Sequence, residues 1–192
     1  MKEFFDKVRG SLFGGSLSQT QVDGLNRILD ESKNLSTKHR AYILATAYHE
    51  TDKTMTPLRE YGRGKGRVYG VVDETGKAPY GRGYVQLTWR ENYVRADERL
   101  GLDGALARDY DVALDAEVAA KILVRGMSEG WFTKYKLSDF NTYLDMRRVV
   151  NGTDRAALIA EHARKFEDAL LAITVPDDVP WWLELIRRIF RL

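Results

Sequence analysis

The chain has 192 residues, with 30 Lys and Arg against 28 Asp and Glu and no cysteine. This length predicts one domain with a sizeable core. The lack of cysteine excludes a disulfide scaffold and any zinc or iron–sulfur centre held by thiolates. A net charge of +2 is too even for a dedicated nucleic-acid binder.

No stretch approaches the ~20 apolar residues of a membrane-spanning helix. The charged first residues also lack the apolar segment of a secretory signal peptide. We therefore expect the protein to be made in a cytoplasm.

Helical patterns dominate the first 50 residues. Ser18 opens a capping box before apolar residues at helical spacing, and Ser36 and Thr37 can cap a second helix. We expect this second helix to end near Glu50, since Pro57 cannot continue it. The expected apolar faces consist of Val22, Leu25, Ile28 and Leu29, and of Ile43, Leu44, Ala47 and Tyr48.

The segment 57–83 differs, because glycine occupies positions 62, 64, 66, 70, 76, 81 and 83. We expect loops here, with at most a short hairpin near residues 67–72 that turns at 73–76. A loop of this length inside a compact domain is usually functional.

Helices are predicted again beyond this segment. Thr88 can open a capping box, and further helices are expected at 113–127, 140–150 and 154–173. In the last of these we expect the buried residues to be Leu158, Ile159, Phe166 and Leu170.

The chain ends in a predicted linker at 176–180 and an amphipathic helix from Trp181 to Leu192. This tail either contacts an anionic membrane or docks on the preceding domain, residues 1–175. Its apolar stripe is Trp182, Leu185, Ile186 and Ile189, and its basic residues are Arg187, Arg188 and Arg191.

Glu50 is the first candidate for catalysis, because it lies at the expected end of a helix. The negative end of the helix dipole and apolar neighbours both raise a carboxyl pKa, as a general acid requires. The simpler interpretation is a partly exposed glutamate. A zinc motif is disfavoured, since Lys53 stands where a second histidine would follow His49.

Glu60 is the candidate second carboxylate, ten residues later at the edge of the Gly-rich segment. Inverting glycosidases hold two carboxyl groups about 6.5–9.5 Å apart, with a water between them. The alternatives are that Glu60 pairs with a nearby arginine, and that Glu74 is the second carboxylate.

Gln86 and Thr88 would point to the same side of an extended stretch, where an amide and a hydroxyl can hold a sugar or a water. Thr88 can instead cap the following helix. The neighbouring aromatic residues can stack on sugar rings or lie in the core; they are Tyr80, Tyr84, Trp89 and Tyr93.

Together, three segments resemble glycoside hydrolase family 19, in particular its phage and prophage endolysins. They are His-Glu-Thr at 49–51, Pro-Leu-Arg-Glu at 57–60, and Tyr-Gly-Arg-Gly-Tyr-Val-Gln-Leu-Thr-Trp at 80–89. The resemblance covers about residues 19–171. It implies a mainly α, lysozyme-like domain of two helical lobes, with a Gly-rich loop or short hairpin in the cleft.

The resemblance also implies roles for individual residues. Glu50 matches the general acid, Glu60 the second acidic residue of the phage-type members, and Thr88 a residue that places the attacking water. In the chitinase branch the second acid lies nearer Glu74, and disulfides are present. Substrate contacts are expected from Tyr80, Gln86, Asn92 and Asn151, and a buried arginine near the acids from Arg164.

The expected activity is hydrolysis of β-1,4 glycosidic bonds of bacterial peptidoglycan during host-cell lysis. We expect a monomer that needs no metal or organic cofactor and binds no nucleic acid. It would be made in the host cytoplasm and act on the cell wall after release. The alternatives are a chitinase on the same scaffold, and a non-catalytic protein that binds the wall or disturbs membranes.

Overall fold

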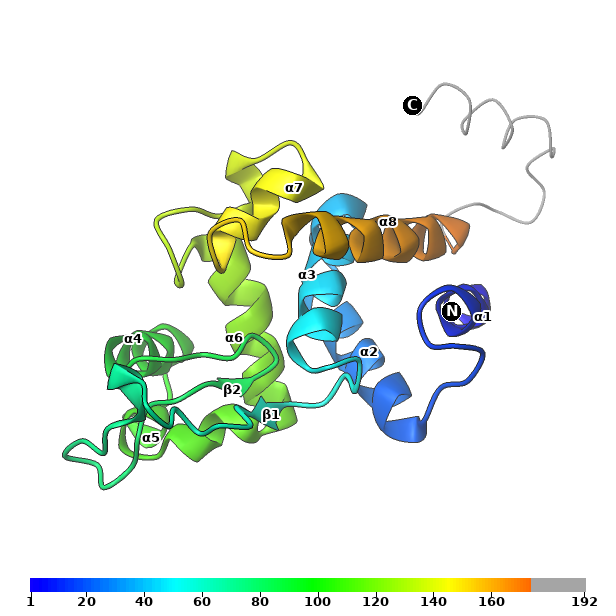
Figure 1. The fold of residues 1–192 in the computed structure, drawn as a ribbon. Coiled ribbons are helices and arrows are strands. Elements are labelled where there is room, and N and C mark those ends of the chain that lie inside the picture. The colour runs from blue at the N-terminus through cyan, green and yellow to red at the C-terminus, as the bar shows by residue number, and fades with distance from the viewer. Residues whose placement is uncertain (174–192) are drawn as a thin grey trace, which may run out of the picture.

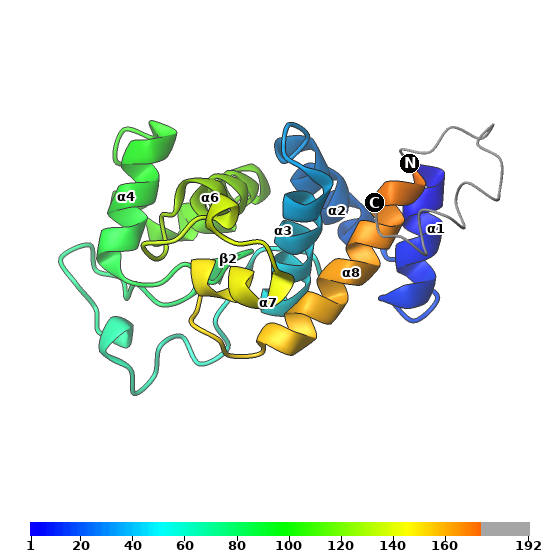
Figure 2. The ribbon, with the colours of Figure 1, turned by 90° about the horizontal axis from the view of Figure 1, so that it is seen from above.

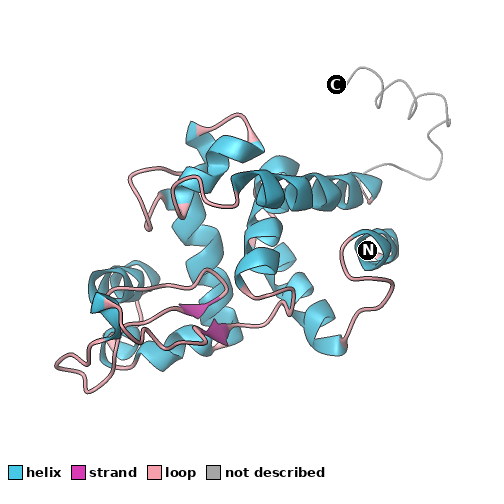
Figure 3. Cartoon of the chain, in the orientation of Figure 1, coloured by secondary structure: helices cyan, strands magenta, loops and turns pink. Residues whose placement is uncertain are grey.

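The computed structural model describes residues 1–173 of the chain and is mainly helical (Figure 3). The linker and amphipathic helix expected at 176–192 lie outside the described residues, so both alternatives for the tail stay predictions. The α-helices are α1 Lys2–Ser11, α2 Gln19–Glu31, α3 Thr37–Glu50, α4 Arg90–Leu100, α5 Ala105–Arg108, α6 Ala116–Glu129, α7 Tyr143–Met146 and α8 Ala156–Ala172.

Helix α3 is the centre of the first lobe and packs against α8 and α2 (Figure 1). Its start and end agree with the prediction: the Ser36 hydroxyl accepts a hydrogen bond from the His39 N–H, and the helix ends at Glu50. Every residue from 41 to 48 is buried. A helix buried on all sides holds its last residue firmly in the interior of the molecule.

The predicted capping box at the start of α2 is present. The Ser18 hydroxyl accepts from the Gln21 N–H at 3.2 Å, and the Gln21 side chain accepts from the Ser18 N–H at 2.8 Å. Helix α1 has no counterpart among the predicted elements. It packs on α8 through Phe4 and Val8, whose spacing of four residues is a helical signal.

The second lobe contains α4, α5 and the 3-10 helix η2, Tyr110–Leu114, and α6 lies between it and α3 (Figure 2). The expected cap at Thr88 is wrong. Trp89 precedes α4 with a φ of 70°, and its N–H donates to the Pro79 carbonyl at 3.0 Å. Within the described residues, no side chain caps the start of α4.

The hairpin expected at 67–72 is also wrong. The only sheet in the described part pairs β1, Leu58–Arg59, with β2, Arg82–Gly83, antiparallel, with Leu58 opposite Gly83. Residues 60–81, the Gly-rich loop, connect the two strands and contain the 3-10 helix η1, Val68–Gly70. The backbone at 67–71 instead forms local turns, in which the Gly70 N–H donates to the Arg67 carbonyl at 3.0 Å and the Val71 N–H to the Val68 carbonyl at 3.3 Å. The turn at 73–76 is confirmed, since the Gly76 N–H donates to the Asp73 carbonyl at 3.0 Å.

The later helices agree with the prediction in position but not in every detail. Helix α6 begins after Asp115, whose carboxylate accepts from two N–H groups of the first turn. The stretch expected as one short helix at 140–150 consists of α7 and the 3-10 helix η4, Arg147–Val149. Leu158 is 38% exposed, not buried, because the side of α8 that meets the core follows Ile159, Ala163 and Phe166.

Arg82 fixes the base of the Gly-rich loop and is almost fully buried. Its Nε donates to Asp111 Oδ1 at 2.7 Å, and its Nη1 donates to the Tyr80 carbonyl at 2.9 Å. The guanidinium lies over the Tyr80 ring, 3.7 Å from the ring centroid. None of the helices within residues 1–173 is both long and apolar enough for a membrane span.

Candidate active site

A cavity of about 410 Å³ lies where the end of α3 faces the segment before α4. It contains Glu50 together with four of the side chains expected to contact substrate or water. The residues that line it are Glu50, Tyr69, Val85, Gln86, Leu87, Thr88, Trp89, Asn92, Phe132, Val150 and Asn151. Glu50 and Asn151, which are 101 positions apart in the sequence, thus line the same cavity.

Glu50 is held by a buried arginine. Its Oε1 accepts a hydrogen bond from Arg147 Nη1 at 2.9 Å, and the two side chains are 17% and 3% exposed. Arg147 Nε in turn donates to the Asp154 carbonyl at 2.9 Å, which fixes the guanidinium from its other side. The second Glu50 oxygen makes no hydrogen bond within residues 1–173, so it is free to meet a ligand in the cavity.

Arg147 is the site residue that sequence reasoning misses. Arg164, expected near the acids, is exposed on α8. The adjacent Arg148 is exposed as well, and nothing in the sequence distinguishes it from Arg147. The buried apolar residues on either side, Met146 and Val149, flank both arginines and therefore do not distinguish them.

Gln86 is held with its amide fixed. Its backbone has a φ of 53°, and its Nε2 donates to the carbonyls of Leu58 at 3.1 Å and Gly83 at 3.2 Å. Its Oε1 faces Gly81, where an added β-carbon would lie 2.8 Å from that oxygen and 3.4 Å from the Glu60 β-carbon. A side chain at position 81 would therefore displace the Gln86 amide, and Gly81 lies next to both Gln86 and Glu60.

Glu60 lies directly behind the cavity wall and is half-buried. Its Oε2 accepts from the Gly81 N–H at 3.2 Å, and its Oε1 accepts from the Tyr69 hydroxyl at 3.3 Å. Tyr69 lines the cavity, and burial together with the Glu60 charge raises the pKa of its phenol. Within residues 1–173 Glu60 forms no ion pair, contrary to the arginine-paired alternative.

Glu74, the other candidate for the second carboxylate, lies elsewhere. Its side chain is 68% exposed and pairs with Arg90 Nη2 at 2.6 Å. It does not line the cavity. Glu60 does not line the cavity either, but it accepts a hydrogen bond from Tyr69, which does, so we favour Glu60 over Glu74 as the second carboxylate.

Thr88 and Asn92 supply polar groups at the start of α4. Asn92 Nδ2 donates to the Thr88 carbonyl at 2.9 Å, and its Oδ1 accepts from Arg95 at 3.2 Å. The Thr88 hydroxyl makes no hydrogen bond to the described part of the chain, so it remains available to a water or a sugar. Asn151 faces the same cavity, and its N–H donates to the Arg147 carbonyl at 3.0 Å.

The aromatic candidates separate into two groups. Tyr84 and Tyr93 belong to the core, and the Tyr80 ring lies on Arg82 outside the cavity lining. Trp89 lines the cavity, is 44% exposed, and meets the ring of Tyr69 edge-on with centroids 5.4 Å apart. An exposed indole beside a polar cavity presents a flat apolar face of the kind that sugar rings stack on.

A second cavity, of about 190 Å³, lies on the other side of α3. It contains His49 and His162, and burial lowers the pKa of both imidazoles. Across residues 1–173, no three His, Cys, Asp or Glu side chains gather in a group able to hold a metal ion.

No family model and no curated protein matches this sequence. Two solved structures are similar in fold. Chitinase C from Streptomyces griseus HUT6037 has 21% identity and a TM-score of 0.60, over 88% of this chain and 75% of that chain. A mutant form of chitinase C has 21% identity and a TM-score of 0.56, over 93% of this chain and 94% of its own. The chain thus has the mainly α, lysozyme-like fold that its resemblance to glycoside hydrolase family 19 implies.

Proposed function

We propose that this protein is a glycoside hydrolase of the endolysin type, which cuts β-1,4 glycosidic bonds of bacterial peptidoglycan. The observation that supports this most is the shared cavity of Glu50, Gln86, Thr88 and Asn92. The fold it shares with chitinase C supports the same chemistry. The proposal includes synthesis in a host cytoplasm, release to the cell wall, and action as a monomer.

Glu50 is the proposed general acid. Arg147 holds one carboxyl oxygen in place, and the other oxygen can donate its proton to the glycosidic oxygen that leaves.

Glu60 is the proposed general base. The Gly81 N–H and the Tyr69 hydroxyl hold its carboxylate, and Gln86 lies beside it across Gly81. The carboxylate takes a proton from a water that the free Thr88 hydroxyl helps to place. The water attacks the face of the sugar opposite Glu50, so the product forms with inverted configuration.

The decisive experiment measures kcat of E50Q and E60Q on purified peptidoglycan. Loss of a general acid or base lowers the rate by about 10²- to 10⁴-fold. E74Q is the matched control, because its exposed carboxylate should contribute little to either activity or folding. Full activity of E50Q on isolated walls, with wild-type circular dichroism, would refute Glu50 as the acid and favour a non-catalytic wall binder.

A chitinase is the second candidate, because chitinase C is among the solved structures that are similar in fold. Rates on chitin oligomers and on purified peptidoglycan distinguish the two activities. Proton NMR of the first product anomer tests inversion. Mass spectrometry of released muropeptides, with and without borohydride reduction, identifies which sugar carries the new reducing end.

A further inference from the structure

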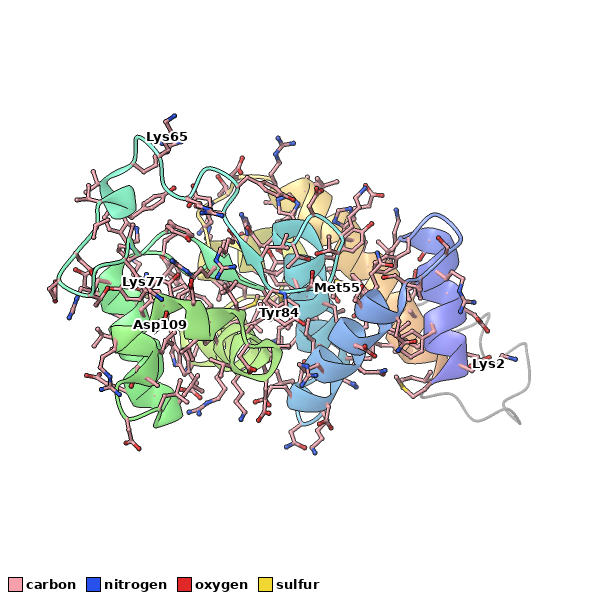
Figure 4. All side chains as sticks on the ribbon, turned by 90° about the horizontal axis from the view of Figure 1, so that it is seen from below. Lys2, Met55, Lys65, Lys77, Tyr84 and Asp109 are labelled. Carbon is pink, nitrogen blue, oxygen red and sulfur yellow. The ribbon has the colours of Figure 1, made fainter. Side chains whose placement is uncertain are left out.

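Three exposed cations of the Gly-rich loop have no acidic partner. Arg63, Lys65 and Arg67 form no ion pair within residues 1–173. Figure 4 shows Lys65 at the outer end of the loop, whereas Lys77 of the same lobe lies beside Asp109. Four other cations of this lobe are neutralised, in the pairs Arg59–Asp111, Arg82–Asp111, Lys77–Asp109 and Arg90–Glu74, and Arg95 and Arg108 donate hydrogen bonds to carbonyl oxygens.

The loop that carries these cations is tightly closed. A β-carbon at Gly70 would lie 1.8 Å from the Gly64 carbonyl oxygen, so the two chain segments touch at this point. Between them, the Arg67 N–H donates to the Gly64 carbonyl at 2.9 Å, and the Gly70 N–H donates to the Arg67 carbonyl at 3.0 Å. Hydrogen-bonded turns therefore position the cations, which lowers the entropy cost of using them together.

The same loop forms part of the active-site cavity. Tyr69 lines that cavity, donates to Glu60 and contacts the Trp89 ring. Arg67 is close enough to oppose the rise in the pKa of the Tyr69 phenol that burial causes. The unpaired positive charges thus begin two residues from the cavity wall.

We propose that Arg63, Lys65 and Arg67 bind carboxylates that project from an anionic glycan strand while its sugars occupy the cavity. This inference rests on the proposed function, and it names the residues that would make the protein prefer peptidoglycan to chitin. Peptidoglycan carries carboxylates on its peptide stems, and on its lactyl groups where no stem is attached, whereas chitin is neutral. Each exposed ion pair contributes about 1.4- to fivefold to binding, so three would favour peptidoglycan over chitin by at least about threefold.

The test compares two triple variants of equal charge change. The loop variant is R63Q/K65Q/R67Q. The control is K2Q/K7Q/K33Q, three exposed lysines of the first lobe, and Figure 4 shows Lys2 at the opposite end of the molecule from Lys65. Urea unfolding should differ little among the two variants and the wild type. The loop side chains make no ion pair or hydrogen bond within residues 1–173, and the Lys33–Asp30 pair that the control loses is 3.7 Å long and exposed.

Kinetics on soluble peptidoglycan strands provide the first readout. For the loop variant we expect KM to rise at least about threefold with kcat unchanged, and the rise to shrink at 0.5 M salt, where exposed charges are screened. The KM of the loop variant on chitin oligomers and the KM of the control variant on peptidoglycan should both equal the wild-type values. An equal KM for the loop variant and the wild type on peptidoglycan would overturn the inference.

Co-sedimentation with insoluble peptidoglycan and with chitin provides a readout that does not need turnover. Weaker binding of the loop variant to peptidoglycan alone supports the inference, even if no wall is cut and the proposed function fails. An amidase removes the stems and frees the lactyl carboxyl group to which each stem was joined. Loss of the loop variant's effect on these strands locates the contact on the stems, whereas an effect that persists shows that the lactyl carboxylates are sufficient. Loss of binding to phosphatidylglycerol vesicles with unchanged binding to peptidoglycan would contradict the inference.

Discussion

Removing the Arg147 guanidinium tests how the candidate acid is held. In R147M the side chain keeps most of its apolar length but loses two hydrogen bonds, each 2.9 Å long, to Glu50 and to the Asp154 carbonyl. The methionine also leaves the Glu50 carboxylate without its partner in a largely buried position.

The magnitude follows from the burial of the pair. Removal of one partner of a buried ion pair costs about 3–5 kcal/mol. Glu50 is 17% exposed at the edge of a cavity that can admit water, so we expect the lower limit, about 3 kcal/mol. In a domain of this size that corresponds to a fall in Tm of about 6–12 °C.

Urea unfolding followed by circular dichroism gives the free energy directly. R148M is the control, since its exposed neighbouring side chain should change stability by less than about 0.5 kcal/mol. The double variant E50Q/R147M should lose less stability than the sum of the losses in the two single variants.

Two results would refute this reasoning. One is an equal unfolding midpoint for R147M and R148M, which would mean that the buried pair contributes nothing to stability. The other is strict additivity in the double-mutant cycle, which would mean that the two side chains do not interact.

Two further predictions concern pH. Burial alone would raise the pKa of Asp111, but hydrogen bonds from Arg59 and Arg82 outweigh it and lower the pKa from 3.8 to about 2. This stabilisation, about 1 kcal/mol after allowance for partial exposure, should be present above pH 3.8 and disappear as the pH falls to about 2. The free energies of urea unfolding of D111N and the wild type should therefore differ at pH 6 and converge near pH 2. A difference that stays constant with pH would contradict this prediction. Burial lowers the imidazole pKa of His39, His49 and His162 below 6.5. The unfolded chain therefore binds more protons than the folded chain, and stability should decline as the pH falls below about 6.5. Thermal unfolding from pH 8 to 5 measures this decline, and an unchanged Tm over that interval would contradict the prediction.

The sequence alone determined those features that depend on neighbours a few positions apart. The capping box at Ser18, the cap at Ser36 and the end of α3 at Glu50 all occur as predicted. Each results from hydrogen bonds or side-chain spacing within about one helical turn, and that information is present in a short window of residues. Local sequence was therefore sufficient to assign the candidate acid to the end of a helix.

The tertiary structure alone decided which distant groups surround that acid. The partner of Glu50 is Arg147, 97 positions away, and the partner of the Glu60 carboxylate is the Gly81 N–H, 21 positions away. Packing of η4 against the end of α3 buries one of two adjacent arginines, and the pairing of β1 with β2 brings Glu60 beside Gln86. Such contacts depend on how helices and loops pack in three dimensions, and no local pattern of residues records them.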